Sequence, residues 1–493
     1  MGPLQAQPLQ TRRKTARRAG VVAFVVVVLL GGACSDSSET PANGVIGAEP
    51  RAGQWKTWVV GSPERIKVAP PPEDGSPEAE AELEETRRLA GRRTPQVEEQ
   101  AHKWGDYPMV EPWIRLNMQL VAEQAKNPPL AARGYGLVST AMHDAAIATW
   151  HWKYVYRRDP PPGSPVIPPG PDPSYPSEHA AIAGAASRVL AYLFPERPEA
   201  SYDEMADEAA ESVVASGTNF RSDAKAGLDL GRAVADAVIA RGQADGSQDH
   251  GSVNRPVGVG SWEAPPDNPG AGSQPVEPKA GTWKTWAADA TQIMPGPPPA
   301  FGSPRFMAEV REVYDISQRL TEDQKRIAKY WEGGRGTPLP PGVWNQIALD
   351  EVRKAPLMST PRLTRTFALL NAAQADAGIC AWATKYKYFS TRPVNAIRDL
   401  GIDQAWKPLL PTPVFPSYVS GHSTFSAASA EVLAYLFPAE AARFRAMAEE
   451  AGMSRIYAGI HYPADNVDGL MLGKDTGAAV VQRAREDGAD ARS

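Results

Sequence analysis

Cysteine is nearly absent from this chain. Only Cys34 and Cys380 occur among its 493 residues, and no disulfide can form within the chain if Cys34 is modified. Long hydrophobic runs are also missing after residue 30, where no segment is apolar over the length that a membrane-spanning helix needs. These absences exclude a disulfide-stapled fold and a multi-span membrane protein, so the fold must rest on its hydrophobic cores.

A strong charge of either sign is missing too. The net charge is −5, which gives no reason to expect a nucleic-acid partner. Alternation of apolar and polar residues, typical of β-strands, is scarce. Apolar residues at spacings of three and four recur instead, as in 180–194 and 424–437. The pattern predicts an all-α protein.

The first 34 residues have the composition of an export signal. Several arginines and a lysine precede an unbroken apolar run, Val21 to Leu30, which is too short to span a bilayer comfortably. The run leads to Leu-Gly-Gly-Ala-Cys, ending at Cys34, and resembles a bacterial lipoprotein signal, although Gly31 stands where that pattern prefers a branched apolar residue. We expect an exported protein. It is either a cell-surface or periplasmic lipoprotein, tethered to the membrane only by lipid on Cys34, or a secreted protein with an incidental cysteine.

The chain contains a long internal repeat. Four blocks recur in the same order, and the offset between the copies drifts only from 228 to 243 residues. Chance similarity between alanine-rich helices would not preserve this order, so the repeat indicates a duplication. The paired blocks are 53–58 with 281–286, 143–161 with 375–393, 173–195 with 415–438, and 231–246 with 473–488.

The duplication and the distribution of proline predict the domain organisation. A chain of this length exceeds one ordinary core, and most of its 48 prolines are bunched into segments typical of connections. We therefore expect an all-α fold of two tandem helical bundles, each burying its own apolar stripe. The expected parts are an export signal over 1–34, a linker and N-terminal arm over 35–105, a first bundle over 106–250, a Pro/Gly-rich linker over 251–304, and a second bundle over 305–490.

Three segments of the second half collect residues suited to holding a tetrahedral oxyanion. Such an anion spreads its charge over several oxygens, and it favours guanidinium forks, an ammonium group and the amides of a helix N-terminus. The first two kinds of group are available in Lys385, Arg392 and Arg455. Ser420 and Gly421 open a predicted helix, where the glycine lets the backbone approach a ligand closely.

Two of the seven histidines of the chain lie inside the same three segments. His461 has Asp465 four residues further on, so on a helix the carboxylate could hold the imidazole in one tautomer. That arrangement suits a nucleophile or a metal ligand. His422 follows the glycine of the second segment and could serve as a general acid or base.

The three motifs, K-x6-RP, SGH and SR-x5-H-x3-D, together resemble the signature of the type 2 phosphatidic acid phosphatase and vanadium haloperoxidase superfamily, over most of residues 305–480. The haloperoxidase branch fits best, because Trp382 lies three residues before the lysine and Phe415 seven before His422. That branch also has two bundles, with the site in the second. One departure is Val419, where the family has proline. We expect it to loosen the turn without removing a ligand.

The resemblance implies a role for each matching residue. His461 would bind vanadium in a vanadate cofactor, or attack phosphorus in a phosphatase, and His422 would be its acid–base partner. Trp382 and Phe415 would line the halide side of the pocket, or belong to the core. The groups that would bind the oxyanion are Lys385, Arg392, Ser420, Gly421 and Arg455.

Three functions stay open at this point. A vanadium-dependent haloperoxidase would oxidise halide with hydrogen peroxide, with Lys385 polarising the bound peroxide. An acid phosphatase would cleave phosphate esters through a phosphohistidine at His461, with His422 protonating the leaving group. A non-catalytic exported helical binding protein would have lost a ligand, and the second half has lost none of those expected. We favour the haloperoxidase.

The first copy of the repeat lacks most of these groups. Lys153, Ser177 and His179 align with the lysine, serine and histidine of the second copy, but Glu178 replaces Gly421, and we expect its carboxylate to repel an anion. Of the upstream residues His143 and Asp144, we expect a buried structural role. The remaining site positions align as Arg392 with Pro160, Arg455 with Val213, His461 with Asn219 and Asp465 with Asp223. One site per chain is predicted, in the second bundle.

Overall fold

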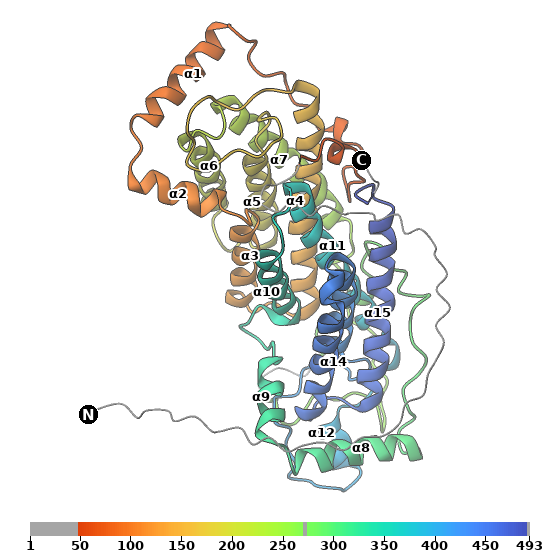
Figure 1. Cartoon of the computed structure of the whole chain (residues 1–493). Coiled ribbons are helices and arrows are strands. Elements are labelled where there is room, and N and C mark those ends of the chain that lie inside the picture. The colour runs from red at the N-terminus through yellow and green to blue at the C-terminus, as the bar shows by residue number, and fades with distance from the viewer. Residues whose placement is uncertain (1–47, 270–273, 491–493) are drawn as a thin grey trace, which may run out of the picture. The chain divides into compact units, whose positions relative to one another are not determined.

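A computed structural model describes residues 48–269 and 274–490 (Figure 1). Over these residues the protein consists of fifteen α-helices, short 3-10 turns and loops, with no β-strand. The predicted all-α class is therefore confirmed. The N-terminal signal, including Cys34, lies outside the described residues. No helix in the described part of the chain is both long and apolar enough to cross a membrane.

The duplication is visible in the lengths of the helices. Both long central helices have 29 residues, and each ends at a residue in the left-handed conformation, Arg157 with φ 52° and Phe389 with φ 49°. Three later helices of each half again agree in length, at 16, 17 and 23 residues, and the short helix α12 (Pro393–Asp399) of the second half has no partner in this series. The pairs are α4 (Pro128–Tyr156) with α11 (Thr360–Tyr388), α5 (Glu178–Leu193) with α13 (Gly421–Leu436), α6 (Glu199–Ala215) with α14 (Ala441–Tyr457), and α7 (Arg221–Gln243) with α15 (Pro463–Arg485).

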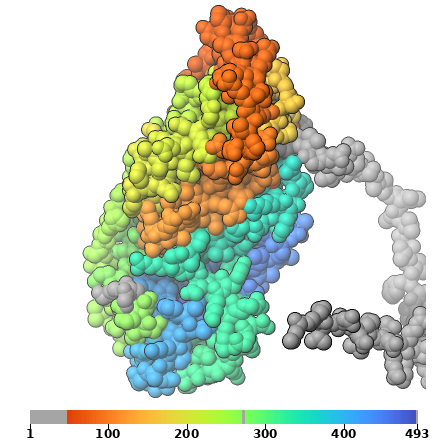
Figure 2. All heavy atoms as spheres, turned by 90° about the vertical axis from the view of Figure 1, so that its left-hand side faces the viewer, coloured from red at the N-terminus to blue at the C-terminus, as the bar shows by residue number. Residues whose placement is uncertain are grey.

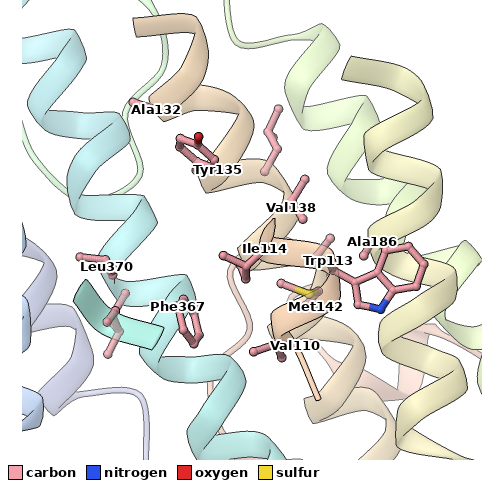
Figure 3. Close-up of a cluster of buried hydrophobic side chains, with 14 of the residues drawn as sticks. Val110, Trp113, Ile114, Ala132, Tyr135, Val138, Met142, Ala186, Phe367 and Leu370 are labelled. Carbon is pink, nitrogen blue, oxygen red and sulfur yellow. The ribbon is translucent and has the colours of Figure 1, made fainter. Parts of the chain in front are cut away.

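The two halves are joined through α4 and α11, which pack against each other along their length. Figure 3 shows Phe367 of α11 pointing toward side chains of α3 (Glu111–Glu123) and α4, among them Ile114 and Met142. All three side chains are fully buried and belong to one hydrophobic cluster that draws residues from both halves. The expectation of a separate stripe for each bundle therefore does not hold, because α4 and α11 each bury a face against the other copy.

Each long helix binds a segment of backbone through a buried aspartate. We call these two segments, residues 58–60 and 286–288, the straps. Asp144 of α4 accepts the amides of Trp58, Val59 and Val60 at 2.7, 2.7 and 3.1 Å. Asp376 of α11 accepts those of the equivalent segment 286–288 at 2.6, 2.8 and 2.8 Å. The Trp-Lys-Thr-Trp repeats therefore belong to the packed structure, where we had expected an arm and a linker.

The buried residues His143 and Asp144 have the structural role that we expected. The ring of His143 contacts the Thr364 hydroxyl at 3.2 Å, across the junction of the halves. The segment before residue 106 also contains helices α1 (Pro77–Ala90) and α2 (Pro95–Gly105), drawn in orange in Figure 2, where they lie over the end formed by the first half. Both pack on α6.

Helices α8 (Pro304–Ser317), α9 (Glu322–Tyr330) and α12 (Pro393–Asp399) lie near the end of the second half, where they pack on α14 or on each other. Helix α9 begins with the predicted capping box: Thr321 Oγ1 accepts the Gln324 amide at 3.2 Å, and Gln324 Oε1 accepts the Thr321 amide at 3.0 Å. It packs on α14, so its C-terminal end comes close to Arg455. Helix α10 (Leu339–Lys354) packs on α3 and α4 as well as on α11 and α13. The 3-10 turns are Ala52–Gln54 and Pro63–Arg65, which contact α4, and Ala280–Thr282 and Pro438–Glu440.

Candidate active site

The three motifs of the second half meet at the end of the helices that carry them. Lys385 lies in the last turn of α11, Arg392 caps α12, and Ser420 caps α13. Arg455 lies near the end of α14, and His461 precedes α15. The side chains of Lys385, Arg392, Arg455 and His461 are buried. The constellation predicted from spacing is thus assembled in three dimensions.

His461 is fixed at both ring nitrogens. Nδ1 lies 2.8 Å from Oδ2 of Asp465, and Nε2 lies 3.1 Å from Nη1 of Arg392. Because a carboxylate only accepts and a guanidinium only donates, the ring carries its hydrogen on Nδ1 and a lone pair on Nε2. Burial, aided by Arg392 and Lys385, holds the pKa of His461 well below its usual range. A neutral imidazole whose Nε2 carries a lone pair and no hydrogen suits a nucleophile or a metal ligand.

The guanidinium of Arg392 has one nitrogen that donates no hydrogen bond to any residue that the structure describes. Its Nε donates to the Phe415 carbonyl at 2.9 Å, and its Nη1 donates to the Ile460 carbonyl at 2.7 Å. Its Nη2 is buried and has no hydrogen-bond partner among the described residues. A buried guanidinium nitrogen without an acceptor is costly, and the oxygen of an anion would satisfy it. The orphaned nitrogen is thus an observation, independent of sequence motifs, that fits an oxyanion beside His461.

Lys385 is placed differently from the expectation. Its ammonium group donates to the carbonyls of Pro416, Ser417 and Val419 at 2.8, 2.9 and 2.6 Å. An ammonium has three hydrogens, so all of them are directed at the turn that leads into α13. Burial and Arg392 lower its pKa well below the ordinary value. In this arrangement the lysine holds the turn, and an oxyanion contact would replace one of these carbonyls.

The N-terminus of α13 offers the predicted amide of Gly421 but not that of Ser420. The Ser420 amide donates to the Asp465 carbonyl at 2.9 Å, and its hydroxyl accepts from the Ser423 amide at 3.3 Å. The next two amides, of Gly421 and His422, are at positions that have no partner within a helix. These two, rather than the Ser420 amide, are the donors that the helix presents to an anion.

Arg455 and His422 both contact the end of α9. Nη2 of Arg455 donates to the Ala328 carbonyl at 2.8 Å, and Nε2 of His422 lies 3.2 Å from the Glu332 carbonyl. A carbonyl only accepts, so the neutral His422 ring carries its hydrogen on Nε2 and can accept a proton at Nδ1. Burial, then Arg455 and His461, lower the pKa of His422 well below its usual range. Burial also lowers the pKa of Arg455 to about 9.

The aromatic residues of the site are packed rather than open. The Trp382 ring lies 4.9 Å from that of Phe415, and the Trp382 side chain is fully buried, with its indole N–H donating to the Val276 carbonyl at 3.1 Å. The Phe415 ring lies 5.0 Å from both Lys385 Nζ and Arg392 Cζ. Trp382 is therefore a core residue, and the half-buried Phe415 ring contacts both cations.

We expected Val419 to loosen the turn before α13, but the structure shows no such change. The Tyr418–Val419 peptide is cis, like the Tyr175–Pro176 peptide at the same place in the first copy. The Val419 carbonyl is one of the three that Lys385 holds. The replacement of proline therefore leaves a turn of the same form.

Ser417 is a contributor that the motifs did not contain. Its hydroxyl donates to Oδ2 of Asp465 at 2.5 Å, and its Oγ lies 3.5 Å from Nδ1 of His461. Burial raises the pKa of Asp465, and the Ser417 hydroxyl is foremost among the groups that oppose this rise. The signal that could have identified the serine is its recurrence at the equivalent position 174 of the first copy.

The first copy fills its version of the site with its own side chains. The Glu178 carboxylate lies 2.9 Å from Nζ of Lys153, which also donates to the Pro173 carbonyl. Asn219 occupies the position of the histidine and accepts from the Ser177 hydroxyl at 3.1 Å. The predicted exclusion of an anion by Glu178 takes the form of an ion pair with the lysine.

Comparisons with known proteins relate the chain to two groups. Residues 365–441 and 437–487 match the family described as the VCPO second helical-bundle domain. A vanadium chloroperoxidase from Curvularia inaequalis is 31% identical over a match that covers 20% of this chain and 20% of that protein. A lipid A 1-phosphatase from Rhizobium etli is 44% identical over 12% of this chain and 25% of that protein. The chain thus spans about a fifth to a quarter of the length of these curated relatives.

Among solved structures, the likeness extends over both halves. A bacterial vanadium-dependent iodoperoxidase has a TM-score of 0.64 and 25% identity, covering 76% of this chain and 95% of that chain. A bacterial vanadium-dependent chloroperoxidase in its holo form has a TM-score of 0.56 at 15% identity, covering 81% and 97%, which shows a shared fold.

Proposed function

We propose that the protein is a vanadium-dependent haloperoxidase, because residues 365–441 and 437–487 match the VCPO second helical-bundle domain and the similar proteins include a vanadium chloroperoxidase and a vanadium-dependent iodoperoxidase. It would bind vanadate in the site around His461 and oxidise halide with hydrogen peroxide. The observation that carries the proposal is the buried His461 with an unprotonated Nε2, set beside the unpartnered Nη2 of Arg392.

The described residues fit a vanadate group. His461 would hold vanadium through Nε2, and the oxygens would be held by Nη2 of Arg392, by Arg455, and by the amides of Gly421 and His422. When bound, vanadate supplies a Lewis acid that activates hydrogen peroxide toward halide.

The other residues of the site would control protons and water. His422 would accept a proton at Nδ1, since Glu332 holds its other nitrogen. Lys385 would keep the turn before α13 in place, and Phe415 would keep water from the two cations.

The extent of the structural likeness favours a haloperoxidase over a phosphatase. The match to the iodoperoxidase covers both copies of the repeat, whereas the match to the lipid A phosphatase covers a short stretch. The phosphatase stays as a second candidate, because the same Nε2 lone pair would attack a phosphate ester and form a phosphohistidine. A non-catalytic binding protein is the least favoured, since no predicted ligand residue is missing from the assembled site.

The deciding experiment compares both chemistries in one preparation. Phosphate-free protein would be assayed for bromide or chloride oxidation by hydrogen peroxide with and without vanadate, and for p-nitrophenyl phosphate hydrolysis. We expect halide oxidation that depends on added vanadate and is lost, by at least about 1000-fold, in His461→Ala. Phosphatase activity without vanadate-dependent oxidation would refute the haloperoxidase, and a His461→Ala protein with both activities intact would refute the site.

We further propose that the protein is exported, on the signal-like sequence of residues 1–34. Metabolic labelling with palmitate would test lipid attachment, with Cys34→Ser as the control. Label in the wild type and none in the variant would support a lipoprotein. Unlabelled protein in the medium would support secretion, and full-length protein in the cytoplasm would refute export.

A further inference from the structure

Ser417 lies outside the three motifs, yet its hydroxyl reaches the pair at their centre. Its Oγ donates to Oδ2 of Asp465, the same carboxylate oxygen that accepts the Nδ1 hydrogen of His461. The Tyr462 amide donates to this oxygen as well, at 3.2 Å. Ser417, Asp465 and His461 are all buried, at 0, 1 and 2% exposure. The orientation of the Asp465 carboxylate is therefore set by three donors, and one of them is a side chain that can be removed.

The backbone of Ser417 is held independently of this hydroxyl. Its amide donates to the Ser390 carbonyl at 3.1 Å, and its carbonyl accepts from Lys385 at 2.9 Å. Since both backbone groups are anchored, the turn does not need the bond between Ser417 and Asp465 to keep its form. The hydroxyl is thus free for a role at the carboxylate.

The equivalent serine of the first copy uses its hydroxyl differently. The Ser174 amide donates to the Arg158 carbonyl at 2.8 Å, just as the Ser417 amide donates to Ser390. Its hydroxyl, however, donates to the carbonyls of Arg158 and Asp159 at 3.4 and 3.1 Å. Asp223, the counterpart of Asp465, lies 2.8 Å from a guanidinium nitrogen of Arg158 instead. The Ser174 hydroxyl also lies near enough to Asp223 to lower the pKa of that carboxyl. The copies therefore differ in what the carboxylate holds, which is the Asn219 amide at 3.4 Å in the first copy and the His461 ring at 2.8 Å in the second.

We propose that Ser417 is a positioning residue of the oxyanion site. Its hydroxyl holds the Asp465 carboxylate in the orientation that keeps the hydrogen of His461 on Nδ1 and turns Nε2 toward the anion. This inference rests on the proposed function, in which Nε2 of His461 contacts the anion. Without the hydroxyl, Oδ2 keeps only the His461 and Tyr462 donors, so the carboxylate and the ring it holds gain freedom to rotate.

Equilibrium binding to the full chain tests the proposal. Calorimetry at one fixed pH would measure the affinity for orthovanadate and, separately, for inorganic phosphate. We expect Ser417→Ala to weaken both by about 10- to 100-fold, as is usual when a group that orients a ligand residue is removed. Ser417→Thr keeps the hydroxyl and should restore most of the affinity. Ser174→Ala is the matched control in the first copy and should leave both affinities unchanged.

A second readout follows the histidine directly, without any anion. Two-bond 15N–1H correlation spectra of protein with 15N-labelled histidine, assigned through His461→Gln, report which ring nitrogen carries the hydrogen. We expect one tautomer, with the hydrogen on Nδ1, in the wild type and in Ser417→Thr, and a mixture in Ser417→Ala. If Ser417→Ala does not fold, Ser417→Cys takes its place, because its thiol is a weak donor of similar size.

The outcomes separate this inference from the proposed function. Unchanged affinities together with an unchanged tautomer in Ser417→Ala would overturn the positioning role. An equal loss of affinity in Ser174→Ala would also overturn it, since it would reveal a general effect on stability. A wild type that binds neither vanadate nor phosphate would overturn the proposed function, and the tautomer spectra would still decide whether Ser417 positions His461.

Discussion

Lys153 and Lys385 occupy the same place in the two copies of the repeat, near the end of a 29-residue helix, but they face different partners. Lys153 pairs with a carboxylate from the following helix, whereas Lys385 directs all three hydrogens at backbone carbonyls. The backbone contacts around the two lysines are the same. The Ser177 amide donates to the Asp223 carbonyl at 2.9 Å, and the Ser420 amide donates to the Asp465 carbonyl at 2.9 Å.

The two copies differ in the source of the negative charge at this place. The first copy supplies its own, through Glu178, and compensates the buried lysine internally. The second copy has glycine at that position and keeps its arginines and a neutral histidine, and Nη2 of Arg392 lacks a partner among the described residues. Glu178 at the start of a helix, together with the loss of the two arginines and the histidine, therefore separates a self-neutralised copy from one that favours an external anion.

The largest effect on anion affinity is expected when the residue of the first copy replaces its counterpart in the second copy. In Gly421→Glu the carboxylate should pair with Lys385 as Glu178 pairs with Lys153. Like-charge repulsion should then weaken binding of vanadate or phosphate by at least about 100-fold. Gly421→Ala is the control, because a Cβ there would meet only the rings of Trp382 and Phe425, at 3.6 and 3.9 Å. Calorimetric titration measures both, and an unaffected Gly421→Glu would contradict the comparison.

The reverse position tests the first copy through stability. Glu178→Gln leaves the ammonium of Lys153, whose side chain is 2% exposed, without its carboxylate. We expect a loss of about 3 kcal/mol in the free energy of unfolding, measured with urea, and no change in anion affinity. Loss of activity with unchanged stability would be the opposite of this expectation.

The same variant carries a pH dependence. Burial alone would raise the pKa of Glu178, but Lys153 and His179 outweigh it and lower the pKa. A carboxyl with a lowered folded pKa contributes stability above its unfolded pKa of about 4.3 and loses it as the pH falls through the folded value. The stability difference between wild type and Glu178→Gln should thus be constant from about pH 5 to 8 and shrink in acid.

The smallest effect on stability is expected for an arginine–tryptophan contact that both copies share. The guanidinium of Arg241 lies 3.3 Å over the Trp286 ring, and that of Arg483 lies 3.5 Å over the Trp58 ring. Each contact fastens the strap of one copy to the last helix of the other. Arg241→Gln and Arg483→Gln should each cost about 1 kcal/mol, with anion affinity unchanged. Strongly unequal losses in thermal unfolding experiments would show that the frame is less symmetric than the contacts indicate.

The sequence was sufficient for those features that are set by residue type and spacing. Helical periodicity predicted the fold class, the repeat predicted a duplication into two related halves, and the spacing of His461 and Asp465 predicted their contact. The partners of Lys385 and the amide of Ser420 were not predictable in this way, because backbone carbonyls and amides occur at every residue. The contacts of the two straps were not predictable for the same reason, because Asp144 and Asp376 bind backbone amides, which every residue except proline has.

The packing of α4 against α11 has a consequence for how such a chain could arise. Before the duplication, a single copy would have exposed the apolar face that now bears Phe367 or its counterpart, and a second copy of itself is the partner whose shape matches. Fusion of the two genes would convert that homodimer contact into an intramolecular one. The ancestral assembly would have held two equivalent sites, and after fusion either could lose its chemistry while its helices continued to support the other.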